Sequence, residues 1–185
     1  MRSSILLLVV FALFPLLSNA QSTDALQTFE SAVADSRNGN LIDALEGFSE
    51  TLRIIEHDPA SDAFTAKVQY NIGVTLYNLG LLPEAKGHLE KALRSSKNRH
   101  VKAHYVLGLT NFEMNRIEDA ERSFKSSLIL DNRNGDAWYD LGRTYLALNE
   151  IQKAKRAFAK AEKSGVGNRE PVETAIAVHP LTTDE

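Results

Sequence analysis

The fold of this chain is easiest to read in residues 136–145, which are Asp-Ala-Trp-Tyr-Asp-Leu-Gly-Arg-Thr-Tyr. The glycine of this segment, Gly142, is followed twelve positions later by Ala154. Two earlier glycines, Gly73 and Gly108, are each followed by an alanine at the same distance. The three glycines are 35 and 34 residues apart, so the sequence repeats itself with that period.

Other positions recur with the same period. An apolar residue precedes each glycine, and a Leu or Phe lies four positions after each alanine. A more divergent copy comes before these three, with Ala32 at the glycine position and Ala44 at the alanine position. We therefore expect four repeats, at about residues 25–58, 66–100, 101–134 and 135–168.

Each copy has the pattern of two amphipathic helices, because apolar residues return at steps of three and four on both sides of a short break. The breaks contain Gly or Asn, which tolerate the left-handed backbone that ends a helix. A single helical hairpin cannot bury both of its faces, so successive hairpins are expected to stack. Each glycine lets the two helices of a hairpin approach, with a large residue such as Phe124 or Phe158 beside it. The four breaks are 38–40, 78–80, 114–116 and 148–150.

Residues 136–145, taken with Ala154, Phe158 and Ala161, resemble a tetratricopeptide repeat at nearly every signature position. The resemblance covers about residues 25–168. It implies an all-α, right-handed superhelical solenoid of about four helix-turn-helix repeats. An insertion around Pro59 separates the first two copies, and a longer first helix of the second repeat is expected to start near Ser61.

The first twenty residues have the layout of a secretory signal. Arg2 precedes an apolar run from Ile5 to Leu17, and Ser18-Asn19-Ala20 supplies small residues for cleavage after Ala20. The alternative is an uncleaved membrane anchor, although a helix that spans a bilayer needs about 20 apolar residues. We expect a mature chain that starts at Gln21 and is exported, to a bacterial periplasm or as a secreted protein, without stable membrane insertion.

The expected organisation is a signal peptide at 1–20, a repeat domain at 21–168, and a capping segment with a tail at 169–185. Within the last segment, Pro171 to Val178 could form a short capping helix, since Pro favours the first turn. The segment could instead fill the concave groove.

Composition and motifs argue against catalysis. The chain has no cysteine, and its net charge of -3 gives no basic excess for nucleic-acid binding. His100 and His104 have the spacing of a helical metal pair but lack a third ligand, and 131–136 matches a turn better than a calcium loop. We expect no enzyme activity, no catalytic residue, no cofactor and no metal site.

The family resemblance implies a partner-binding groove lined by the first helix of each repeat. At 100° per residue, Trp138, Gly142 and Tyr145 face the inside of the hairpin, whereas Tyr139 and Arg143 lie on a face about 130° away. Three tyrosines share this second register, and lysines precede two of them by three positions. The expected groove residues are Tyr70, Tyr105, Tyr139, Lys67, Lys102, Asn71, Tyr77, Phe112 and Arg143.

Some members of the family hold a partner's C-terminal carboxylate with Lys, Asn and Arg at set positions. Here Asn71 and Lys102 match, but Phe29, Val33 and Val106 replace the other polar residues.

We expect an exported scaffold or adaptor that binds a protein or peptide in an envelope assembly. The alternatives are a homo-oligomeric subunit that self-associates through the groove or the solenoid ends, and a membrane-tethered accessory subunit.

Overall fold

A computed structural model describes residues 23–55 and 62–165 of the chain, and within these ranges it contains helices and no strand. The expected all-α solenoid is thereby confirmed. The signal segment 1–20 and the capping segment 169–185 lie outside the described residues. The helices are a first helix at 23–37, α2 Leu41–Ile55, α3 Asp62–Asn78, α4 Leu82–Ser95, α5 Val101–Glu113, α6 Ile117–Leu130, α7 Gly135–Ala147 and α8 Ile151–Ser164.

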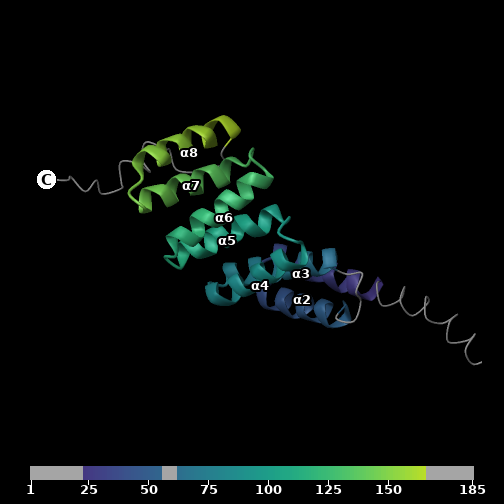
Figure 1. The fold of residues 1–185 in the computed structure, drawn as a ribbon. Helices are drawn as coiled ribbons and strands as arrows, with labels where there is room; N and C mark the ends of the chain where they lie inside the picture. Colours follow the sequence, from purple (N-terminus) through teal and green to yellow (C-terminus); the bar gives the residue numbers. More distant parts are fainter. Residues whose placement is uncertain (1–22, 56–61, 166–185) are drawn as a thin grey trace, which may run out of the picture.

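The helices are arranged as a stack of hairpins. Figure 1 shows the pairs α3–α4, α5–α6 and α7–α8 following one another from the N-terminal end to the C-terminal end. In the last three hairpins each helix contacts its hairpin partner most extensively, and the second helix of one hairpin contacts the first helix of the next. No described helix is long and apolar enough to cross a membrane. Helix α3 begins at Asp62 and has 17 residues, in agreement with the longer helix expected there.

The turns inside the hairpins fall at the breaks that the sequence predicts. Each contains one residue with a left-handed backbone, namely Gly39, Gly80, Asn115 and Asn149, with φ between 56° and 84°. Glycine and asparagine accept this conformation at low cost, whereas most residues with a Cβ resist it. The turn residues therefore fix where each hairpin reverses.

Close helix contact depends on the glycines of the repeat. A Cβ built on Gly108 would lie 2.5 Å from Cε1 of Phe124, and one on Gly142 would lie 2.6 Å from Cε1 of Phe158. Both phenylalanines are fully buried. The first repeat reverses the arrangement, because Ala32 on the first helix packs against Gly47 on the second. The expected small-against-large packing is thus present in the third and fourth repeats.

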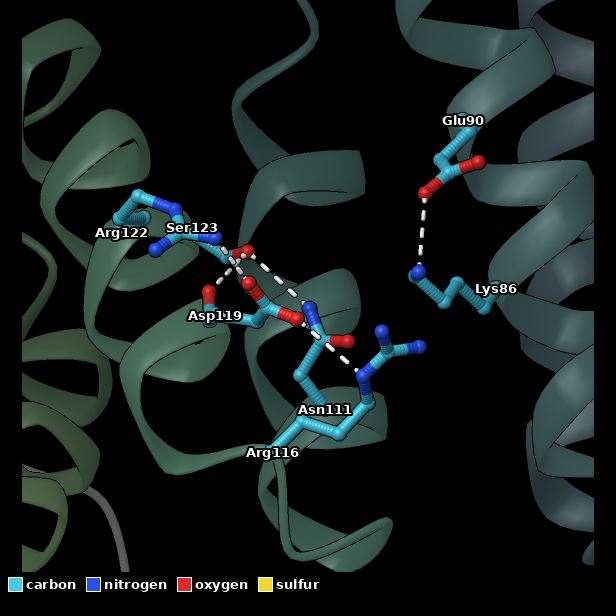
Figure 2. Close-up of polar contacts among 7 residues, drawn as sticks. All are labelled: Lys86, Glu90, Asn111, Arg116, Asp119, Arg122 and Ser123. Carbon is cyan, nitrogen blue, oxygen red and sulfur yellow. Dashed lines mark hydrogen bonds and ion pairs between the residues drawn. The ribbon is translucent and has the colours of Figure 1, made fainter.

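The third repeat carries a polar substitute for an aromatic residue. Asn111 stands at the position of Tyr145, is 2% exposed, and donates a hydrogen bond from its amide to Ser123 Oγ at 3.3 Å (Figure 2). Ser123 in turn donates to the Asp119 carbonyl at 2.8 Å. The Asp119 carboxylate pairs with Arg116 at 3.1 Å. A hydrogen-bonded connection between α5 and α6 replaces ring packing there.

The last hairpin differs from expectation at Trp138. We expected this ring inside the hairpin, but it is only half-buried. Its indole N–H donates to the Asn132 carbonyl at 2.8 Å, and Lys160 Nζ lies 4.0 Å from the ring centroid. Among the described residues α8 is the last helix.

Candidate partner-binding groove

An open groove of about 690 Å³ lies where the first helices of the first three repeats meet. The helix at 23–37, α3 and the start of α5 form its walls. It brings together four of the expected groove residues, Lys67, Tyr70, Asn71 and Lys102. The complete lining is Phe29, Glu30, Val33, Arg37, Lys67, Tyr70, Asn71, His100 and Lys102.

Aromatic contacts organise this groove. Lys67 Nζ lies 4.8 Å from the centroid of the Phe29 ring, a cation–π distance. The rings of Tyr70 and His100 have centroids 4.6 Å apart and are inclined by 30°. Asn71 donates its amide to the Lys67 carbonyl at 2.8 Å. These contacts hold the side chains at the groove wall.

His100 has two functions in this arrangement. It is the N-cap of α5, and its Nδ1 accepts a hydrogen bond from the Ala103 N–H at 3.1 Å. An accepting Nδ1 requires the neutral ring with its proton on Nε2. Burial lowers the pKa of His100, and the nearby positive charge of Lys102 lowers it further. At neutral pH the groove therefore contains a neutral imidazole whose Nε2 carries a donor hydrogen.

The lining has a positive balance. Arg37, Lys67 and Lys102 are basic, and Glu30 is the acidic residue among them. Lys67 and Lys102 are exposed, and within the described ranges neither forms an ion pair. Unpaired cations beside aromatic surface favour an anionic ligand with an apolar part.

The next part of the first-helix face is occupied by the chain's own side chains. The Tyr105 hydroxyl donates to Asp140 Oδ2 at 2.8 Å, and Arg143 contacts the other carboxylate oxygen at 3.4 Å. Asp140 is 2% exposed, so this carboxylate is buried between α5 and α7. Tyr105, Asp140 and Arg143 therefore bind one another and connect α5 with α7.

A second bridge connects α3 with α5. The Tyr77 hydroxyl donates to Glu113 at 2.9 Å, and the guanidinium of Arg143 lies 4.8 Å from the Phe112 ring centroid. Burial, followed by the hydrogen bond to Glu113, raises the pKa of Tyr77 to about 12. Tyr77, Phe112 and Arg143 therefore stabilise the contacts between consecutive first helices.

The expected exposure of Tyr139 is wrong. Its side chain is 3% exposed, because the ring packs edge-on against Phe158 with centroids 5.3 Å apart. Tyr105, at the same register, contacts Phe124 in a similar way at 5.9 Å but remains half-buried. A shared register therefore does not determine the exposure of the side chain, which depends on its packing against other helices.

Sequence reasoning also missed several residues. Arg37, Glu30 and His100 line the groove, and Asp140 and Glu113 accept the tyrosine hydrogen bonds. The bridging Asp140 has a signal in the sequence. It lies two positions before the repeat glycine, where the preceding repeats have Asn71 and Val106, so it is the one carboxylate at that register among these three repeats.

The histidine pair and the oxygen-rich turn serve local structure. His104 Nε2 lies 3.2 Å from the Asn98 carbonyl, whereas His100 caps α5. In the turn, Asp131 accepts from the Arg133 N–H at 3.1 Å, and Asn134 accepts from the Ala137 N–H at 3.0 Å as the N-cap of α7. No group of three or more metal-binding side chains occurs within 23–55 and 62–165.

The histidines predict how stability depends on pH. Burial lowers the pKa values of His88, His100 and His104 from the ordinary 6.5, so the unfolded chain binds protons more readily than the folded chain. The contribution of these neutral histidines to the free energy of unfolding is therefore fully present above about pH 6.5 and is lost as the pH falls below that value. Urea midpoints measured between pH 7.5 and 5.5 should decrease. His100→Asn keeps a capping side chain without the titration and should show a shallower decrease. Equal slopes for the two proteins would contradict the role given to His100.

Comparison with known proteins agrees with this architecture. Two sequence models of the tetratricopeptide repeat match residues 70–137 and 111–177. Comparison with curated proteins returned no match.

Solved structures of low sequence identity share the fold. A crystal structure of MamA has a TM-score of 0.69 at 17% identity, with 80% of this chain and 82% of that chain covered. MamA from Desulfovibrio magneticus RS-1 has a TM-score of 0.67 at 18% identity, with 77% and 78% covered. BtubC from P. vanneervenii has a TM-score of 0.70 at 16% identity, with 80% and 66% covered. Since identities this low show the fold alone, the sequence matches and the stacked hairpins together establish that this chain contains tetratricopeptide repeats.

Proposed function

We propose that this protein is an exported adaptor that holds a segment of a partner protein in the groove between its first three repeats. The observation that supports this proposal best is the open groove of about 690 Å³, with aromatic walls and three basic side chains. Concave sites of this size with a few convergent polar groups are typical of binding sites. The remaining first-helix positions stabilise the solenoid itself through Tyr77 and Tyr105.

Export is the second part of the proposal. It is supported by the basic residue, the apolar run from Ile5 to Leu17 and the small residues up to Ala20. An exported adaptor of this kind would act in an envelope assembly. Intact-mass measurement on protein from the native host should give a chain that begins at Gln21. A full-length species retained in the membrane fraction would instead support the tethered alternative.

Groove variants test the adaptor function. Lys67→Ala/Tyr70→Ala/Lys102→Ala removes an aromatic and two cations from the groove, and aromatic anchors at an interface commonly contribute about 2 kcal/mol or more. Affinity capture from the native envelope should lose its partner. The matched control Lys91→Ala/Lys155→Ala removes two exposed cations on second helices and should capture as the parent does.

The control and the groove variant must have the same helicity by circular dichroism. If the groove variant retains every partner, the partners bind to another surface of the protein. Size exclusion at several concentrations separates the adaptor from the self-associating alternative, since only the latter predicts a mass that grows with concentration.

A further inference from the structure

A tyrosine–carboxylate contact between two repeats indicates what the groove binds. In the third repeat, Tyr105 donates its hydroxyl hydrogen bond to the carboxylate of Asp140, which lies on the first helix of the following repeat. The bond measures 2.8 Å, and the basic Arg143 contacts the same carboxylate. The unit therefore consists of a tyrosine, a carboxylate and a cation, placed across two neighbouring first helices.

The preceding repeat has the same tyrosine and lacks the carboxylate. Tyr70 and Tyr105 both lie three positions before their repeat glycine. Asp140 lies two positions before its glycine, and the residue at that register in the third repeat is Val106. Valine cannot accept a hydrogen bond, so the fold does not supply the acceptor that Tyr105 has.

The groove around Tyr70 provides positive charge for such an acceptor and, in the part of the chain that the structure describes, leaves the Tyr70 hydroxyl without one. Within the described ranges the Tyr70 side chain is half-buried, and no acceptor for its hydroxyl lies among these residues. Lys67 and Lys102 line the same groove and provide the positive charge that Arg143 provides beside Asp140. The groove therefore contains the tyrosine and the cations of the unit, and its carboxylate is missing.

We propose that a side-chain carboxylate of a partner protein binds in the groove at the Tyr70 hydroxyl, beside Lys67 and Lys102, because the position equivalent to Asp140 is filled by the buried side chain of Val106. The inference rests on the proposed function of the groove as a partner-binding site. Phe29 and Val33 form apolar wall on the neighbouring helix, so the segment that fits has an Asp or Glu close to an apolar residue. Position 106 then determines specificity, because an acidic residue there would accept the Tyr70 hydrogen bond from within the chain.

Selection from a random peptide library tests this proposal without knowledge of the natural partner. Displayed ten-residue segments are selected on the full mature chain and sequenced. The expected result is enrichment of Asp and Glu next to apolar residues. Selected segments without acidic enrichment would overturn the carboxylate site and leave the groove as a binding site. Selection of no segment above background would contradict both the site and the proposed peptide-binding function.

The consensus peptide then serves as the probe in fluorescence anisotropy. Replacing its acidic residue by Asn or Gln should weaken binding about tenfold or more, because hydrogen bonds to charged groups are the stronger class. Tyr70→Phe removes only the hydroxyl. It should reduce the affinity for the acidic peptide and leave that for the amide peptide unchanged. Equal losses for both peptides would overturn the assigned role of the hydroxyl.

Val106→Asp tests directly whether a carboxylate binds the Tyr70 hydroxyl as Asp140 binds that of Tyr105. The introduced carboxylate should accept the Tyr70 hydrogen bond and weaken binding of the acidic peptide by at least about tenfold, since the peptide must now compete with a tethered acceptor. Ile129→Asp is the control, because that residue is 83% exposed on α6 and adds the same charge elsewhere. Unchanged binding by a folded Val106→Asp protein would overturn the inference. Should this variant fail to fold, Tyr70→Phe still decides the question.

Discussion

Phe124→Ala is expected to lower the free energy of unfolding by about 3 to 5 kcal/mol. The phenylalanine is fully buried in α6, and its ring edge lies against Gly108 of α5. It also contacts the ring of Tyr105 at a centroid distance of 5.9 Å. Truncation would remove these contacts and leave a cavity in the middle of the solenoid, where the helices on both sides are held by further hairpins and can collapse little.

Urea unfolding followed by far-ultraviolet circular dichroism measures this loss. Trp138→Ala is the matched comparison, since it removes an even larger ring from a half-buried position at the last hairpin. Because only part of that ring is withdrawn from water, we expect a smaller loss, about 1 to 2 kcal/mol. Equal losses for the two variants would mean that Trp138 is as well packed as Phe124.

Gly108→Leu is expected to destabilise the protein by about 1 to 3 kcal/mol or more. Even a Cβ at this position would approach Cε1, Cδ1 and Cζ of Phe124 within 2.5 to 2.9 Å, so α5 and α6 must separate to accept a side chain. The effect opposes helix propensity, because leucine favours a helix more than glycine does. Packing therefore decides the sign of the change.

Gly87→Ala provides the control for this prediction. Gly87 lies inside α4, and a Cβ there would have no neighbour within 4 Å. Because alanine loses less backbone entropy on folding than glycine and meets no neighbour here, it should stabilise the protein by about 0.5 to 1 kcal/mol. Opposite shifts of the two urea midpoints are the expected result. Stabilisation by Gly108→Leu would contradict the close helix contact.

Much of the architecture could be predicted from local rules. The 34-residue spacing of Gly108 and Gly142 predicts the hairpins, and Gly or Asn at the breaks predicts the turns. These features depend on residues close in sequence, or on one helix meeting its immediate partner. The pairing of Gly108 with Phe124 is such a case, since both belong to one hairpin.

The candidate site could be predicted only in part. The register of Tyr70, Tyr105 and Tyr139 predicts one shared side of the first helices, and the different environments of the three rings do not follow from it. Tyr139 is buried against Phe158, Tyr105 is bound by Asp140, and Tyr70 lines the open groove. Each outcome depends on a residue of another helix, which a single helical pattern does not contain.

The sequence by itself determined the all-helical repeat, the number of hairpins and the residues that form their turns and tight contacts. It also predicted Lys67, Tyr70, Asn71 and Lys102 as groove residues. The tertiary structure alone decided that these four lie together in one groove with His100, while the following first helices are bridged by their own side chains. The reason is that a hydroxyl or a cation is available to a partner only when the neighbouring repeat leaves it without an acceptor, and that depends on the stacking of helices about 8 to 10 Å apart.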